Sequence, residues 1–140
     1  CLEISASELI HLQAFVNLEE LILSRIAIEV LPDLSELTKL QSVKLEGLKL
    51  SVLDSLAIPG GLLSLSLADT NVDGYVGPIL AEFQQLRSLN LSGTNIDRFT
   101  LLDLSTLNNL QELNLRGVNF EPADIAALQM MLPDCVIVRE

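Results

Sequence analysis

Few residues of this chain could do covalent or metal chemistry. Among 140 residues there are one histidine, His11, and two cysteines, Cys1 and Cys135. A single histidine without nearby cysteines cannot supply the usual ligand count of a zinc site. Cys135 stands at an apolar, inward position, the fourth of its segment, where neither a base nor a lowered pKa is expected. The sequence contains no glycine-rich phosphate loop either, so we predict no catalysis and no cofactor.

Polar and charged residues offer chemistry of another kind, which is recognition. Seven of them recur at matching places in similar segments of the chain: Lys44, Ser66, Arg87, Asn90, Glu112, Asn114 and Arg116. Four of these share the fifth position of successive segments, and the two arginines and the glutamate flank them. An exposed arginine is a frequent hot-spot residue because its planar group can pair and stack at once. We predict that this set binds a macromolecular partner through hydrogen bonds and ion pairs.

The segments that carry these residues are copies of one eleven-residue phrase. It reads LEELILSRIAI from Leu18, LQSVKLEGLKL from Leu40, LLSLSLADTNV from Leu62, LRSLNLSGTNI from Leu86 and LQELNLRGVNF from Leu110. A clipped copy, LPDCVIV, begins at Leu132. The six starts are 22, 22, 24, 24 and 22 residues apart. Such regular spacing indicates a tandem repeat array.

The apolar pattern of one phrase predicts a short strand followed by a turn. The fourth and sixth positions are apolar and point to the same side of a strand, since side chains alternate between its two faces. Positions two, three, five, seven and eight are mostly polar and are expected to face outward. The eleventh position is apolar again, so the chain turns back beneath the core. One unit cannot bury this apolar wall alone, and stacked neighbours bury it together.

These phrases resemble the leucine-rich repeat signature L-x-x-L-x-L-x-x-N/C-x-L, in the bacterial type with repeats of 22 to 24 residues. The resemblance extends from about Leu18 to Val138. It implies an α/β fold: a right-handed, horseshoe-like solenoid with a parallel sheet on its concave face and helices, 3₁₀ turns or loops on its convex face. The ninth position departs from the family, because Thr70 and Thr94 replace its asparagine in two copies and apolar residues replace it in three. A threonine hydroxyl can still bond the backbone of the turn.

The segments between the phrases contain helix signals. Asp97 is expected to cap a helix in DRFTLLDLSTL that places Phe99, Leu102 and Leu107 on its apolar side. Pro122 is expected at the first position of a helix in EPADIAALQMML, and another helical turn should follow Gly77 and Pro78. Near the start, residues 5–8 (SASE) have the spacing of a capping box. Residues 59–61 (PGG) predict a loop.

The length and the repeats predict one domain over residues 1–140. Residues 1–17 form a partial or capping N-terminal unit, 18–131 the five repeats, and 132–140 a terminal strand and tail. The incomplete first unit and the missing initiator methionine suggest a piece of a longer protein, although processing would explain them as well. Cys1 could carry a lipid anchor, but the truncation reading is favoured because residues 2–4 already resemble an ordered strand. Both an exported and a cytoplasmic location stay open.

Charge and hydropathy restrict the partners. No apolar run reaches the roughly 18 residues of a membrane helix, so no membrane insertion is expected. The net charge of −11 argues against nonspecific nucleic-acid binding. The outward strand positions hold six acids and five bases, which leaves 13 of the 19 acids but only 3 of the 8 bases elsewhere. Because strong charge of one sign keeps a surface unattached, the nearly neutral strand face is the better candidate for recognition.

The sequence therefore predicts a non-catalytic, protein-binding module that recognises its partner through the concave face. Two other hypotheses fit the same residues. The chain could be the targeting domain of a larger enzyme, as in effector ligases or receptor kinases built on such repeats. It could also be a structural spacer of a cell-surface protein, in which the outward residues are merely hydrophilic.

Overall fold

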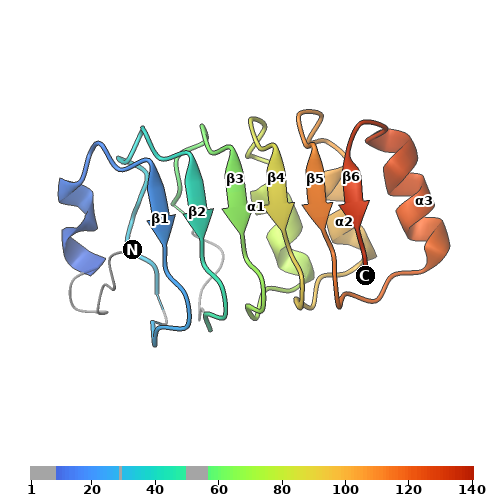
Figure 1. Ribbon diagram of the computed structural model, residues 1–140, viewed down its shortest axis with the longest axis horizontal. Coiled ribbons are helices and arrows are strands. Elements are labelled where there is room, and N and C mark those ends of the chain that lie inside the picture. Colours follow the sequence, from blue (N-terminus) through green and yellow to red (C-terminus); the bar gives the residue numbers. More distant parts are fainter. Residues whose placement is uncertain (1–8, 29, 50–56) are drawn as a thin grey trace.

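The computed structural model describes residues 9–28, 30–49 and 57–140. Its framework is one six-stranded parallel sheet in which the strands follow each other in chain order. The strands are β1 (Glu20–Ile22), β2 (Ser42–Lys44), β3 (Ser64–Ser66), β4 (Ser88–Asn90), β5 (Glu112–Asn114) and β6 (Val136–Val138). Figure 1 shows them side by side along the long axis of the molecule, all pointing in the same direction. Each of the five full phrases and the clipped copy contributes one strand.

Short helices precede the first strand and connect the strands of the C-terminal half. They are the 3₁₀ helices η1 (Leu9–Ala14) and η2 (Gly74–Val76) and the α-helices α1 (Gly77–Leu80), α2 (Arg98–Leu104) and α3 (Pro122–Met131). Helices α1 and α2 lie behind the sheet, and α3 lies at its C-terminal end (Figure 1). α2 packs against both α1 and α3. One side of the sheet is therefore covered by helices and the other, the outward face, carries only strand side chains.

The core lies between the sheet and the returning segments. In β4 the central residue Leu89 is fully buried, and so are Leu86 before it and Leu91 after it. The same three positions are buried in the repeats of β2, β3 and β5. Burial of a leucine side chain contributes roughly 1.5–3 kcal/mol, and this row repeats in every unit, so the stacked leucines are the main source of stability.

Backbone hydrogen bonds extend the stacking beyond the strands. The carbonyl of Arg87 accepts from the amides of Gln111 and Glu112 at 2.8 and 3.0 Å, and the amide of Gly93 donates to the carbonyl of Arg116 at 2.8 Å. Five residues at the eighth position have φ between 55° and 72°: Arg25, Gly47, Asp69, Gly93 and Gly117. The eighth position is therefore a left-handed turn and not an outward strand position. The expectation that it is a strand position was wrong.

The threonines at the ninth position act through their hydroxyl groups, as expected. Thr70 and Thr94 are buried, and each hydroxyl donates to a carbonyl three residues earlier, that of Leu67 or Leu91, at 2.6 Å. The bond closes the turn from within the same repeat. The carbonyls of Leu67 and Leu91, which also accept from the backbone amides of the same threonines, thus gain a second hydrogen-bond donor.

The helix starts agree with the sequence signals. The Asp97 side chain accepts from the amides of Phe99 and Thr100, and it caps α2. α3 begins at Pro122, whose missing amide costs nothing at a helix start. α1 begins at Gly77 with Pro78 in its first turn. No helix covers the described residues 57–61, as expected for that loop.

The buried face of α2 differs from the expectation. Phe99 and Leu102 are 62% and 59% exposed, whereas Leu101 and Leu104 are buried. Both pairs are three residues apart, so spacing alone did not distinguish them. α2 packs against α1 and α3 with Leu101 and Leu104 on the inner side, and Leu107, which follows the helix, is buried as expected.

The last strand is displaced by two residues from its expected register. Ile137 pairs with Leu113 of β5, so Ile137 occupies the fourth position that was assigned to Cys135. Cys135 is also buried, two residues before the position that pairs with Leu113. A slip of two residues keeps every side chain on its original face, because the strand repeat is two. The alternation of apolar residues therefore cannot reveal it.

Several expectations fall on residues that the structure does not describe. They concern Cys1, the half strand over residues 2–4 and the capping box over residues 5–8. Within the described residues, no helix combines the length and the apolar character that a bilayer crossing requires.

The first testable prediction concerns the core. Leu91→Ala should lower the free energy of unfolding by about 2–5 kcal/mol, because it removes buried methyl groups from a fully enclosed position. Urea denaturation followed by circular dichroism measures this change. Leu102→Ala, at an exposed position, is the matched control and should cost well under half as much. Equal losses would contradict the register of the repeats.

The second prediction concerns the turn. Gly93 has φ of +65°, and a Cβ there would clash with the Asp69 carboxylate. The aspartate can move, but the backbone strain remains, so Gly93→Ala should destabilise the protein by roughly 1–2 kcal/mol. Gly61 has open space around it and no such φ, and Gly61→Ala should be neutral or slightly stabilising. Thermal denaturation of both variants distinguishes the two cases.

Candidate binding surface on the sheet

The outward face of the sheet presents two columns of side chains. The strand register aligns Lys44, Ser66, Asn90 and Asn114 in one column at the fifth position. The third positions form the second column: Glu20, Ser42, Ser64, Ser88, Glu112 and Val136. The alignment of the fifth-position residues agrees with the sequence pattern. Whether they bind a partner stays a prediction.

The N-terminal part of this face is occupied by contacts within the protein. The Lys44 ammonium lies 3.6 Å from the Glu20 carboxylate on the neighbouring strand. The Ser66 hydroxyl donates to Glu46 at 2.8 Å, and Ser66 is only 6% exposed. Ser66 was expected to be an exposed binding residue, and that expectation was wrong. The long Glu46 side chain of the preceding repeat covers it, which the spacing of the phrases does not show.

The C-terminal part of the face uses its asparagines differently. The Asn90 side-chain oxygen accepts from the Ser92 amide at 3.0 Å, and the Asn114 oxygen accepts from the Arg116 amide at 3.1 Å. Both bonds are local and hold the chain where it leaves the strand. They use the oxygen of each side chain, while each NH₂ group remains a donor toward solvent. These two half-buried residues can therefore position a partner as well as the turn.

The charged residues of the set lie around the two asparagines. Arg87, Glu112 and Arg116 are exposed. Arg116 donates from Nε to the backbone carbonyl of Glu140, whereas the Arg87 guanidinium has no bond to any described residue. We call Arg87, Asn90, Glu112, Asn114 and Arg116 the β4–β5 surface. It combines two cations, one anion and two amides on neighbouring strands, and hydrogen bonding and ion pairing are the chemistry that it offers.

An apolar margin adjoins the β4–β5 surface and was missed in the sequence. Val136 pairs with Glu112 across β5 and β6 and is 63% exposed. Val138 lies beside Asn114 and is half-buried. The sequence did indicate this margin. Val136 and Val138 alternate with Ile137, so both valines point outward in the expected register of the strand and in the observed one. An exposed apolar residue beside a polar group of this kind is common at the centre of an interface.

The residues considered for covalent or metal chemistry are not brought together. Burial raises the pKa of the Cys135 thiol, and the negative charge of Glu112 raises it further. A thiol with a raised pKa forms less of the reactive thiolate, so Cys135 is poorly placed as a nucleophile. His11 is exposed on η1. Among the described residues, no three His, Cys, Asp or Glu side chains gather closely enough to hold a metal ion.

The arrangement defines a solenoid, in which each strand and its return stack on the previous unit. No family model matches the chain, and no curated protein matches it. Among solved structures, the chain is similar to a leucine-rich repeat protein of Leptospira interrogans, with a TM-score of 0.66 and 24% sequence identity. The similarity covers 90% of this chain but 32% of that protein. The fold is therefore that of leucine-rich repeat proteins, and the chain spans about a third of that protein's length.

Proposed function

We propose that this chain is a non-catalytic module that binds a protein partner through the β4–β5 surface, on the concave face of the solenoid. The observation that carries the proposal is the contrast within one face. On β2 and β3, Lys44 and Ser66 are engaged by Glu20 and Glu46. At the start of β4 and β5, Arg87 and Glu112 are exposed, and their side chains are bonded to no other described residue.

The composition of the surface favours a protein over other macromolecules. Two arginines beside one glutamate and two amides can pair with side chains of both signs and with peptide groups. The exposed Val136 adds apolar area at the edge. A phosphate backbone would require a basic surface, and this chain has a net charge of −11. The specificity belongs to these side chains and not to the fold, since one repeat scaffold serves many partners.

The two other hypotheses differ in what surrounds or uses this surface. A targeting domain of a larger enzyme would use the same surface and would differ only by a catalytic domain elsewhere in the full-length protein. A structural spacer would make no use of the surface at all. Replacement of its arginines therefore tests the spacer hypothesis directly, and the full-length reading frame tests the enzyme hypothesis.

The third prediction is that Arg87→Ala combined with Arg116→Ala weakens the complex with the partner by more than ~1 kcal/mol, or at least about fivefold in Kd. Affinity capture from the source organism with the parent and the double variant identifies proteins that only the parent retains. Isothermal titration with the purified candidate then measures the change, and thermal denaturation checks that the variant is folded.

The matched control is Lys39→Ala combined with Lys49→Ala, which removes the same charge from exposed positions outside the strands. It should leave the affinity nearly unchanged. Equal binding by the parent and the arginine variant would overturn the proposal.

A further inference from the structure

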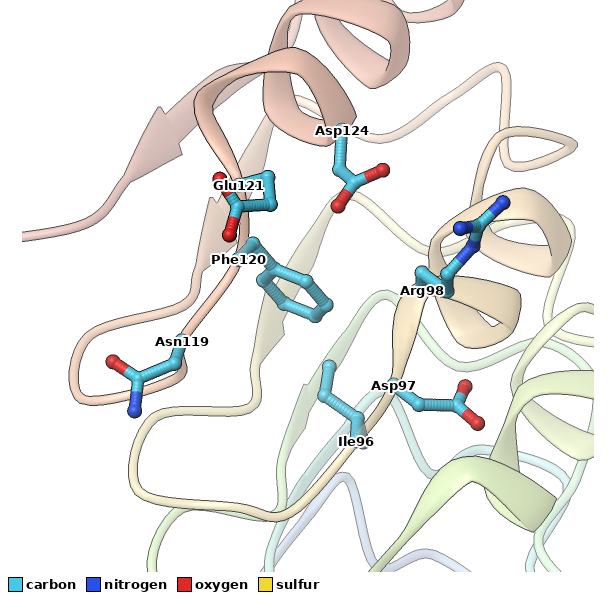
Figure 2. Close-up of a pocket in the computed structure, with 7 residues that line it drawn as sticks. All are labelled: Ile96, Asp97, Arg98, Asn119, Phe120, Glu121 and Asp124. Carbon is cyan, nitrogen blue, oxygen red and sulfur yellow. The ribbon is translucent and has the colours of Figure 1, made fainter.

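The helical side of the molecule contains a groove between α2 and α3. A hollow of about 550 Å³ lies at the N-terminal ends of the two helices, and a smaller one of about 80 Å³ lies further along them. Arg98 and Asp124 line both hollows, which are therefore parts of one groove, the α2–α3 groove. Figure 2 shows the Phe120 ring pointing into it, with Arg98 on the α2 side and Asp124 on the α3 side.

The α2–α3 groove has apolar walls that reach the surface. Leu101 and Leu128 are buried at its floor. Leu102 on one helix and Met131 on the other line it as well and are 59% and 53% exposed. Large apolar side chains that converge on a hollow from two elements, and stay exposed, are typical of a docking surface. Leu102 was expected to face the core, but its exposed side chain lines the groove instead.

The charges of the groove are mainly negative. Three acids line it, Asp97, Glu121 and Asp124, against one base, Arg98. The Asp97 carboxylate is engaged as the cap of α2, and the Arg98 guanidinium lies 5.6 Å from the centre of the Phe99 ring. Glu121 and Asp124 carry no side-chain bond to a described residue. The groove therefore presents apolar contact area with free carboxylates beside it.

We propose that the α2–α3 groove binds a basic amphipathic helix of a partner protein. The exposed Leu102 and Met131 would contact its apolar side, and Glu121 and Asp124 would pair with its lysines or arginines. A helix fits better than an extended strand because no free sheet edge runs along the groove, and a helix satisfies its own backbone hydrogen bonds.

The negative charge also argues against two other occupants. A second copy of this chain carries a net charge of −11 and would be repelled overall, and a membrane with anionic lipids would be repelled in the same way. The proposal concerns the side of the sheet opposite to the β4–β5 surface. It does not depend on the function proposed for that surface.

The fourth prediction is tested with synthetic peptides of about 18 residues, roughly five helical turns. One peptide contains leucine and lysine arranged so that the leucines form a single helical face. The second has the same composition in scrambled order, and the third has glutamate in place of lysine. Fluorescence anisotropy should show that the first binds at least about tenfold more tightly than the other two. Equal binding of the scrambled or glutamate peptide would overturn the proposal.

Two adjacent methionines of α3 provide a matched pair of variants. Met131 lines the groove, whereas Met130 is 83% exposed and does not line it. Met131→Gln should weaken binding of the first peptide about fivefold, and Met130→Gln should change it less than about twofold. An equal effect of both substitutions would show that the peptide binds elsewhere.

The charges are tested in the same titration. Glu121→Gln combined with Asp124→Asn should weaken binding about fivefold at low salt and reduce the salt dependence of Kd. Glu36→Gln combined with Glu82→Gln removes the same charge from exposed positions outside the groove and should have little effect. The Arg87→Ala, Arg116→Ala double variant should bind the peptide as tightly as the parent does. Peptide binding therefore tests the α2–α3 groove separately from partner binding at the β4–β5 surface. Thermal denaturation confirms that each variant is folded.

Discussion

The rest of the structure depends on the inability of a single repeat to bury its own apolar wall. The central residue of an inner strand, such as Leu65 in β3 or Leu89 in β4, is fully enclosed because strands pair with it on both sides. The backbone adds hydrogen bonds in the same direction, from the strand into the left-handed turn that contains Gly93. Stability therefore comes from nearest-neighbour stacking repeated along the array, and every other feature must be compatible with a fixed spacing between the strands.

This constraint leaves two kinds of surface free to vary. Apart from contacts such as Lys44 with Glu20 and Ser66 with Glu46, the outward side chains take little part in the stacking. Exposed residues such as Arg87 and Glu112 can therefore vary without loss of the fold. The helices between the strands are constrained only on the side that is buried against the core, which contains residues such as Leu101 and Leu128. Their outer residues can form a second surface, as Leu102 does in the α2–α3 groove. One scaffold can thus present two independent surfaces of different chemistry, one mixed in charge and one apolar with free acids.

The individual differences between expectation and structure share a physical origin. Ser66 is covered because a glutamate of the adjacent repeat is long enough to reach its hydroxyl. Phe99 and Leu102 are exposed because α2 packs against the helices of neighbouring units with Leu101 and Leu104 instead. Arg25 and Asp69 belong to a turn because their backbone is left-handed there. In each case the decisive contact joins residues of different units or depends on a backbone angle, and neither follows from the pattern within one phrase.

The sequence by itself determined the number of full repeats, the inward row of leucines, the fifth-position column and the helix starts at Asp97 and Pro122. These features are local or strictly periodic, and alternation and capping rules describe them completely. Only the tertiary structure decided that β6 slips by two residues, because both registers place the same side chains inward. It also decided which polar residues remain free for a partner. That outcome depends on side chains from neighbouring units, which meet only after the repeats have stacked.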